Sequence, residues 1–264
     1  MGGRIMANVI DAIINLIENP IISLKQMYLG SNRVNNVGDA LETYVQDLFI
    51  GQYDLPDDLR LQQLSEIFSY KGNTSNPPDL MLKGGDAIEV KKIESRNSDL
   101  AFNSSYPKAK LLIDNPMITT ACKMAENWQK KDMLYAVGVM NGENLQSLAF
   151  VYGDDYFSND GYYNQIQDLI LSDKQHIATA ELKVNWRAKS PFKVFDYIYE
   201  SNANANFDFM AIINDEKWYK LNNASVLKTT IKNNSNAQLQ KVEIKNPNSE
   251  HGYKGAYLIT FFVE

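Results

Sequence analysis

One short stretch of the sequence places two acids and a lysine where core strands are expected. Asp79 follows two prolines, and Glu89-Val90-Lys91 comes after nine intervening residues. Side chains alternate along a strand, so Glu89 and Lys91 share one face while Val90 points to the other. A solvent-facing strand with an incidental ion pair would show the same alternation. The acid at position 79 is what favours a functional interpretation.

Two carboxylates and an ammonium group together could hydrolyse a phosphodiester. Carboxylate oxygens are hard ligands that suit Mg²⁺, so Asp79 and Glu89 are the candidate metal ligands. A bound divalent cation polarises a phosphate and lowers the pKa of a bound water molecule. Lys91 would orient or deprotonate that water, or stabilise the developing charge. The residue type alone leaves these roles of Lys91 open.

The connection between the two strands decides whether these side chains meet. A two-residue turn at Gly84-Gly85 would point Asp79 away from Glu89 and Lys91. A three-residue loop over residues 84–86 would pair Asp79 with Lys91 on the shared face, because a shift of one residue exchanges the two faces of a strand. We predict an odd-numbered loop, or a bend at Asp79 with the same effect.

A helix predicted over residues 38–49 carries a fourth candidate. Its apolar residues form one stripe, as expected for an amphipathic helix, and Glu42 lies beside that stripe. A solvated acid on the helix surface would look the same. As a functional residue, Glu42 would be a third carboxylate ligand or would orient the metal-bound water. The predicted catalytic set is therefore Asp79, Glu89, Lys91 and Glu42.

Three polar segments offer side chains that suit contacts with DNA. Arginine pairs well with guanine and asparagine with adenine, while lysines, hydroxyls and amides contact phosphates. Each segment could equally be ordinary polar surface. The candidate DNA-binding residues are Arg33, Asn35, Asn36, Ser104, Ser105, Lys108, Lys110, Arg187 and Lys189.

The pattern of apolar residues predicts an α/β (α+β) chain in which a mixed β-sheet core is flanked by helices. We expect a single domain over residues 1–264, with residues 1–5 as an upstream extension if Met6 is the native start. Helices are predicted over 9–18, 38–49, 117–131, 162–171 and 215–221, and 192–199 fits either type. Strands are predicted over 65–70, 79–83, 86–93, 133–140, 148–153, 207–214, 240–246 and 256–263.

Composition narrows the classes of function. The chain has 264 residues and 44% hydrophobic residues, enough for a sizeable core. A single cysteine excludes intramolecular disulfides and cysteine-rich zinc sites, and two histidines leave little for histidine-based chemistry. We expect a cytoplasmic protein, because neither a signal peptide nor a membrane-spanning run is visible. The net charge of −6 argues against a nucleic-acid partner, although lysine-rich segments could still form a basic cleft.

The chain resembles the NgoPII-type family of type II restriction endonucleases, within the PD-(D/E)xK nucleases. The Asp-Glu-x-Lys triplet alone is weakly specific, and longer blocks carry the resemblance. These blocks occur in order along most of the chain, and residues about 154–190 match less clearly. They are NNVGDALETYVQDLF, FSYKGNTSNPPDLML, GDAIEVKKIES, NSSYPKAKL, VYGDDY, VFDYIY, NFDFMAIINDEKW and IKNPN.

The resemblance implies a restriction-endonuclease-like core and Mg²⁺-dependent cleavage of double-stranded DNA. It further implies a short palindromic site, GGCC for the family's namesake, with 5′-phosphate and 3′-hydroxyl ends. A homodimer is expected, since a two-fold symmetric site calls for a two-fold symmetric protein. A cognate DNA methyltransferase would protect the host's own sites. By the resemblance, Asp79, Glu89 and Lys91 are catalytic and Glu42 is a plausible fourth.

Three other interpretations stay open at this point. A PD-(D/E)xK repair or junction-resolving nuclease would carry the same residues but cleave DNA structures rather than one sequence. A non-catalytic DNA-binding protein would use the acids structurally. An interaction protein with an incidental ion pair would bind no DNA even at low salt.

Overall fold

The computed structural model describes residues 6–29, 37–73, 76–96, 98, 109–157, 205–245 and 253–264. Arg33, Asn35, Asn36, Ser104, Ser105, Lys108, Arg187 and Lys189 lie outside these ranges, as do the helix predicted at 162–171 and the segment 192–199. Among the described residues, no helix is long and apolar enough to cross a membrane.

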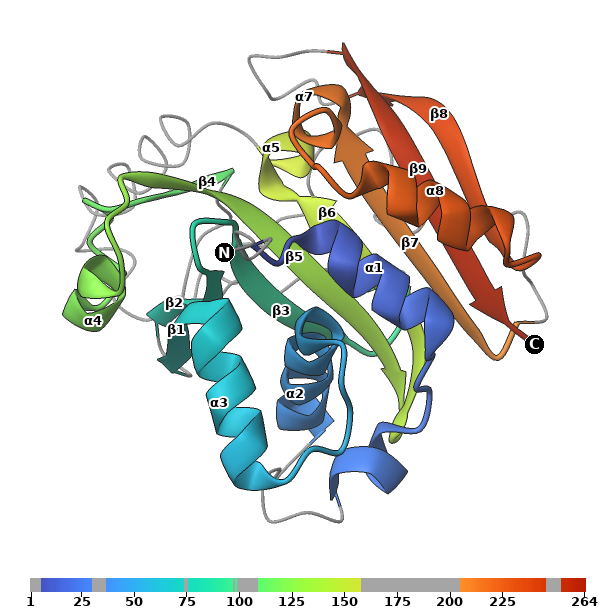
Figure 1. Ribbon diagram of the computed structural model, residues 1–264, viewed down its shortest axis with the longest axis horizontal. Coiled ribbons are helices and arrows are strands. Elements are labelled where there is room, and N and C mark those ends of the chain that lie inside the picture. Colours follow the sequence, from blue (N-terminus) through green and yellow to red (C-terminus); the bar gives the residue numbers. More distant parts are fainter. Residues whose placement is uncertain are drawn as a thin grey trace, which may run out of the picture.

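A mixed sheet of nine strands runs through the described part of the molecule (Figure 1). Eight strands follow the order β1-β2-β3-β5-β6-β7-β9-β8, and β4 pairs with β5 off this path. β3–β5 and β6–β7 are parallel pairs and the others are antiparallel. The strands are β1 (Phe68–Asn73), β2 (Asn76–Leu82), β3 (Ala87–Ile93), β4 (Lys110–Leu112), β5 (Lys130–Asn141), β6 (Asn144–Tyr152), β7 (Phe207–Asn214), β8 (Ala237–Lys245) and β9 (Tyr253–Val263).

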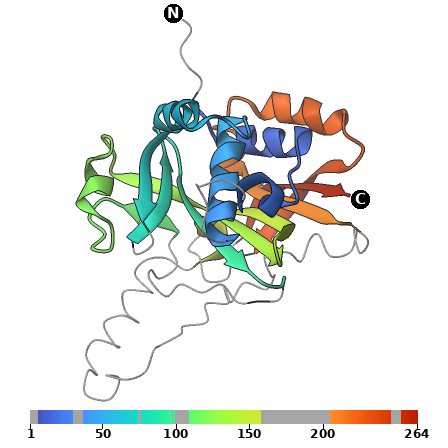
Figure 2. The ribbon, with the colours of Figure 1, turned by 90° about the horizontal axis from the view of Figure 1, so that it is seen from below.

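Helices cover one face of this sheet, as Figures 1 and 2 show for α1, α2, α3 and α8. Apolar side chains of α1 and α2 pack there against alternate residues of the central strands. A second apolar cluster covers the opposite face and includes side chains from α4 and α5. The helices are α1 (Val9–Glu18), α2 (Val37–Ile50), α3 (Asp57–Ile67), α4 (Thr120–Met124), α5 (Gly153–Tyr156), α7 (Asp215–Trp218) and α8 (Ala224–Lys232), with a π-helical turn η1 (Lys25–Leu29).

The predicted fold class is confirmed, since helices flank a mixed sheet. The predicted bounds of α1 and β7 match the structure, and α2 exceeds its prediction by one residue at each end. These elements have strong periodicity: α1 buries one face against the sheet, and β7 is buried along its whole length.

Some predicted elements were wrong. The helix expected at 117–131 is only α4, because the Trp128 indole donates to the Cys122 carbonyl and β5 already begins at Lys130. The strand expected from residue 65 begins at Phe68, where α3 ends. Neither α3 nor α8 was predicted. In α3 the only buried residue is Arg60, so the helix has no apolar stripe to reveal it.

Candidate active site

The β2–β3 hairpin has the odd-numbered loop that the site requires, one residue earlier than predicted. Leu80 pairs with Ile88 and Met81 with Ala87, and the Leu82 amide donates to the Asp86 carbonyl at 2.9 Å. The loop is therefore residues 83–85, where Gly84 adopts a positive φ of 64°. Continuing this register places Asp79 opposite Glu89. The predicted pairing of Asp79 with Lys91 was wrong, although the shared face was right.

The Asp79 carboxylate lies at the point where the ladder between β2 and β3 ends. Its Oδ2 accepts a hydrogen bond from the Val90 amide at 2.7 Å, beyond the last backbone pair, Leu80–Ile88. The Asp79 side chain thus takes the place of a β2 backbone carbonyl as the hydrogen-bond acceptor for β3. This contact holds the Asp79 carboxylate beside Glu89.

Glu89 and Lys91 project from the face of β3 opposite to α2. Ile88 and Val90 pack on the helix-covered side, as the alternation predicted. The Lys91 ammonium donates to Glu89 Oε1 at 2.7 Å. Glu89 is only 4% exposed, and its other oxygen, Oε2, is buried with no hydrogen-bond partner in the part of the chain that the structure describes. A buried carboxylate oxygen without a partner is costly, so it suggests a partner beyond the residues that the structure describes.

The electrostatics at Asp79 are a second observation that suggests a missing partner at this place. Burial, the negative charge of Glu89 and, to a smaller extent, that of Glu42 raise the pKa of Asp79 to about 7. The Val90 amide and the Lys91 ammonium oppose this rise without cancelling it. Two neighbouring carboxylates with too little positive charge suit a divalent cation that takes hard oxygen ligands. Within the described ranges, no group of three or more His, Cys, Asp or Glu side chains is arranged as a metal site. Asp79, Glu89 and Glu42 therefore do not form a three-carboxylate site, and Asp79 and Glu89 are the pair of described carboxylates that could share a cation.

Glu42 lies on α2, near enough to Asp79 for its negative charge to add slightly to the raised pKa of that carboxyl. Burial raises the pKa of Glu42, and the negative charge of Asp39 adds to this rise. The positive charge of Lys71 opposes it. Its Oε1 accepts a hydrogen bond from the Gln46 side-chain amide at 3.0 Å. Sequence reasoning missed Gln46, although a glutamine four residues after the helix acid is a readable signal, because such residues neighbour each other on a helix.

Gly72 on β1 is a second residue that sequence reasoning missed. A Cβ atom at this position would lie 2.2 Å from the Pro78 carbonyl oxygen and 3.2 Å from the Cα of Asp79. The β1–β2 register also shifts between Lys71 and Asn73. A glycine therefore allows β1 to approach the backbone that carries Asp79. The close approach depends on which strand pairs with β2, which the sequence does not show.

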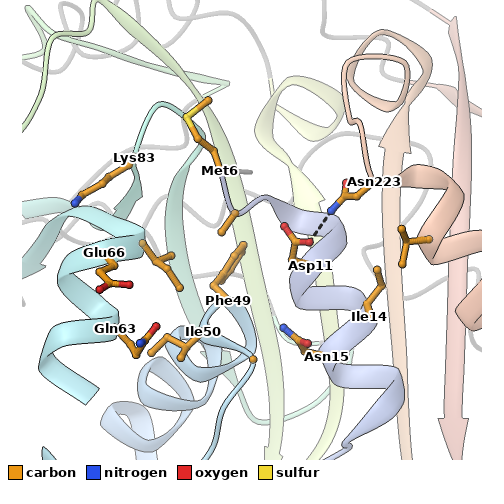
Figure 3. Close-up of a pocket in the computed structure, with 14 residues that line it drawn as sticks. Met6, Asp11, Ile14, Asn15, Phe49, Ile50, Gln63, Glu66, Lys83 and Asn223 are labelled. Carbon is orange, nitrogen blue, oxygen red and sulfur yellow. Dashed lines mark hydrogen bonds between the residues drawn. The ribbon is translucent and has the colours of Figure 1, made fainter. Parts of the chain in front are cut away.

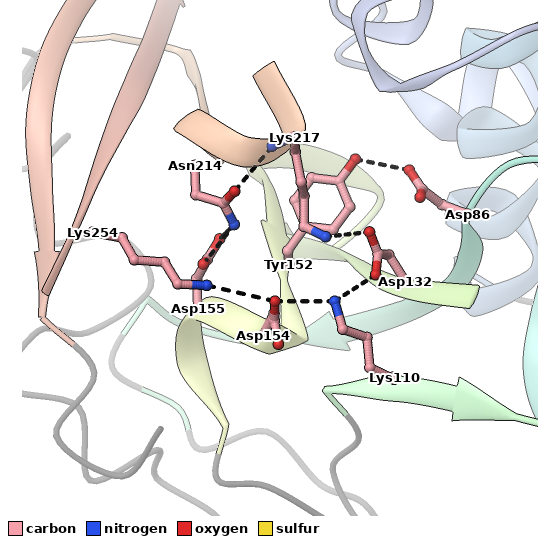
Figure 4. Close-up of polar contacts among 9 residues, drawn as sticks. All are labelled: Asp86, Lys110, Asp132, Tyr152, Asp154, Asp155, Asn214, Lys217 and Lys254. Atoms are coloured by element: carbon pink, nitrogen blue, oxygen red, sulfur yellow. Dashed lines mark hydrogen bonds and ion pairs between the residues drawn. The ribbon is translucent and has the colours of Figure 1, made fainter. Parts of the chain in front are cut away.

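Lys110 is the one predicted DNA-binding residue that the structure describes. Its ammonium forms ion pairs with Asp132 (2.5 Å) and Asp154 (3.0 Å). Lys217 also pairs with Asp132, and Lys254 lies 3.7 Å from Asp154. Figure 4 shows these five side chains as an alternating row of cations and anions, which we call the lysine–aspartate row. The row occupies the Lys110 ammonium, which makes Lys110 a weaker candidate for DNA contact than free lysines would be.

A groove of about 810 Å³ lies on the helix-covered side, among α1, α2, α3 and the start of α8 (Figure 3). Ile14, Phe49 and Ile50 contribute apolar walls, and an Asn223–Asp11 hydrogen bond of 2.6 Å lies at one side. None of the predicted site residues lines this groove. The candidate site is therefore the polar group at the divergence of β2 and β3, and not this groove.

Comparisons with known proteins agree with one another. The family model described as NgoPII restriction endonuclease matches residues 7–185 and 172–245. The type II restriction enzyme NgoPII of Neisseria gonorrhoeae is 45% identical over 277 residues, which cover 96% of this chain and 99% of that relative. No solved structure matches the chain.

Proposed function

The chain belongs to the NgoPII restriction endonuclease family, and from this premise we propose that it cleaves double-stranded DNA at a short palindrome with the Asp79, Glu89 and Lys91 group. It is a type II site-specific deoxyribonuclease. The observation that carries the assignment of the site is the buried Oε2 of Glu89, which has no partner among the described residues and lies beside a second, poorly compensated carboxylate.

Asp79 and Glu89 would hold a Mg²⁺ ion. When bound, the ion supplies Lewis-acid polarisation of the scissile phosphate and acidifies a water molecule. The hydrogen bond from the Val90 amide fixes the Asp79 carboxylate, so the position of one ligand is set by the backbone of β3. Preorganised ligands of this kind need little rearrangement when substrate binds.

Lys91 would act on the phosphate or on the attacking water. Its ammonium already lies 2.7 Å from Glu89 Oε1, which keeps it on the same side of β3 as the carboxylates. A cation there stabilises the negative charge that develops on the phosphate oxygens as water attacks. Glu42, whose negative charge acts on Asp79 from α2, would orient the water.

Family membership and symmetry support the remaining details of the proposal. A palindromic site has two-fold symmetry, so a homodimer would present one active site to each strand. The proposed recognition sequence is GGCC, and the products would carry 5′-phosphates and 3′-hydroxyls. A cognate methyltransferase would modify the same sequence and protect the DNA of the host.

Digestion of unmethylated phage DNA with Mg²⁺, followed by mapping of the ends, tests this proposal. Discrete fragments with ends inside GGCC and 5′-phosphates are expected, and chelation of Mg²⁺ abolishes them. Discrete fragments at another sequence would correct the recognition site alone. A smear, or cleavage confined to junctions and nicks, would contradict site-specific cleavage and favour a repair nuclease.

A further inference from the structure

A continuous chain of polar contacts leads from Glu42 along α2, through Arg60 of α3, to Tyr28 in η1, and it is buried beyond Glu42. Gln46 donates its Nε2 amide to Glu42 Oε1 at 3.0 Å, and its Oε1 accepts from Arg60 Nη2 at 2.8 Å. Arg60 also donates its Nε to Asp47 Oδ1 at 3.0 Å. Asp47 Oδ2 in turn accepts from the Tyr28 hydroxyl at 3.0 Å. Every link lies in the described part of the chain.

The Gln46 side-chain amide lies between Arg60 and Glu42, and the charges of these two groups determine which way the amide points. A guanidinium group only donates and a carboxylate only accepts, so the amide oxygen must face Arg60 and the NH₂ must face Glu42. The reversed amide would set NH₂ against the guanidinium and oxygen against the carboxylate. Gln46 is 0% exposed, so water does not compete for either end. Arg60 thus decides whether Glu42 receives a donor.

The buried position of Arg60 needs a reason beyond stability. Arg60 is 8% exposed and its ion pair with Asp47 is similarly enclosed. Removing two charges from water costs about as much as their attraction returns, so such pairs rarely add net stability. The planar guanidinium, however, reaches two acceptors with a fixed angle between its donors. This geometry suits a group that orients its neighbours.

We propose that Arg60 is a positioning residue for the cleavage reaction, acting through Gln46 to hold the Glu42 carboxylate at the Asp79–Glu89 site. The inference rests on the proposed function, because it takes Glu42 as part of the reacting site. The Gln46 amide contacts Oε1 of Glu42, so Oε2 is the oxygen that would act on water. Without the guanidinium, the Gln46 amide is free to reverse and Glu42 loses its fixed orientation.

The test compares Arg60→Met and Gln46→Leu with Asn15→Ala as the matched control. Asn15 on α1 donates to the Leu48 carbonyl of α2 at 2.7 Å, so its loss also weakens the packing around α2 without touching the contacts of Glu42. Single-turnover cleavage is measured with saturating Mg²⁺ at a temperature where all variants are folded. DNA affinity is measured with Ca²⁺. We expect the rate to fall about tenfold or more in both variants, with DNA affinity within about twofold.

A second readout needs neither metal nor DNA. The Gln46 side-chain amide is assigned in the ¹⁵N–¹H spectrum as the resonance pair that Gln46→Leu lacks. We expect this pair to move in Arg60→Met and to stay in place in Asn15→Ala. A Gln46 resonance that does not move in Arg60→Met overturns the inference, as does an Arg60→Met cleavage rate equal to that of Asn15→Ala.

The two readouts separate this inference from the proposed function. If the wild type fails to cleave with Mg²⁺, the proposed function is wrong, and with it the catalytic part of the inference. If the wild type cleaves and Glu42→Gln cleaves equally well, Glu42 has no part in the reaction and the inference fails alone. A rate loss in Glu42→Gln similar to that in Arg60→Met supports it.

Discussion

Asp79, Glu89 and Lys91, the candidate active-site group, and the lysine–aspartate row use the same residue types with opposite electrostatic results. In the row, burial alone would raise the pKa of Asp132, but Lys217 and Lys110 outweigh it and hold the pKa below its ordinary value. At Asp154, burial would likewise raise the pKa, but Lys110 and Lys254 outweigh it and the pKa is lowered. In the candidate active-site group, burial and Glu89 together raise the pKa of Asp79 to about 7.

The difference lies in the supply of positive charge. Asp132 and Asp154 alternate with lysines along the row, so each carboxylate has cations beside it (Figure 4). Asp79 and Glu89 face each other, and Lys91 is the cation that the structure places against Glu89. In the row both carboxylates are paired with lysines, and these ion pairs join β4, β5, α5, α7 and β9. An unbalanced pair of carboxylates favours the binding of a cation, as proposed above.

Replacing one lysine in each cluster should give the largest contrast. Lys91→Met is expected to lower single-turnover cleavage by about 10²–10³-fold, because a preorganised positive charge is lost from the transition state. Lys217→Met removes a more enclosed lysine from the row and should lower the melting temperature while cleavage continues. Cleavage assays and thermal unfolding of both variants measure this. Equal cleavage by Lys91→Met and the wild type would exclude a catalytic Lys91.

A smaller effect is expected when the backbone of Asp79 is displaced. The Cβ of Gly72→Ala would collide with the Pro78 carbonyl and push β2 away from β1. We expect cleavage to fall about 10–100-fold, since shifts near 1 Å misplace reacting groups by enough to matter. Gly142→Ala is the control: its Cβ meets nothing within 4 Å, but φ is +61°, so it should lose about 1 kcal/mol of stability and no activity. Normal cleavage by Gly72→Ala would show that Gly72 is not needed to position Asp79.

A third effect is a pH-dependent change in stability at the margin of the row. Burial raises the pKa of Asp86 to about 6, although the Tyr152 hydroxyl, which donates to it at 2.7 Å, lowers it in part. The unfolded chain loses this proton near pH 4 and the folded chain near pH 6, so this group makes the folded state less stable as pH rises between these values. Asp86→Asn should therefore match the wild type below pH 4 and exceed it above pH 6, by up to about 3 kcal/mol.

Denaturant unfolding of the wild type and Asp86→Asn from pH 4 to pH 8 measures this difference. Asp132→Asn should behave in the opposite way, because its pKa is lowered by the lysines and its charge stabilises the folded state. An Asp86→Asn variant that loses stability at pH 8 would show that the hydrogen bond from Tyr152 outweighs the burial of the charge.

The sequence was most informative where alternation and chemistry coincide. In β3, Ile88 and Val90 had to face a core, so Glu89 and Lys91 had to share the other face, as they do. The odd number of residues in the β2–β3 loop followed from the requirement that the Asp79 and Glu89 carboxylates meet. The residues of the loop did not follow, because Asp86 accepts the Leu82 amide and buries its carboxylate beside Tyr152 instead of joining the turn.

Residues whose roles depend on tertiary packing could not be predicted. Gly72 matters only because β1 pairs with β2 beside Asp79. Arg60 is the sole buried residue of a helix without an apolar stripe, and its partners Asp47 and Gln46 belong to another helix. Lys110 looked like a free basic residue, since its ion-pair partners Asp132 and Asp154 follow much later in the chain.

The most direct test of the contrast is one measurement on two isosteric variants, Glu89→Gln and Asp132→Asn. Each keeps the size of its side chain and removes one negative charge. Single-turnover cleavage of DNA containing the recognition site is followed across a range of Mg²⁺ concentrations. The account predicts that Glu89→Gln does not cleave at any Mg²⁺ concentration, while Asp132→Asn cleaves at the wild-type rate and loses only stability. Wild-type cleavage by Glu89→Gln would contradict it.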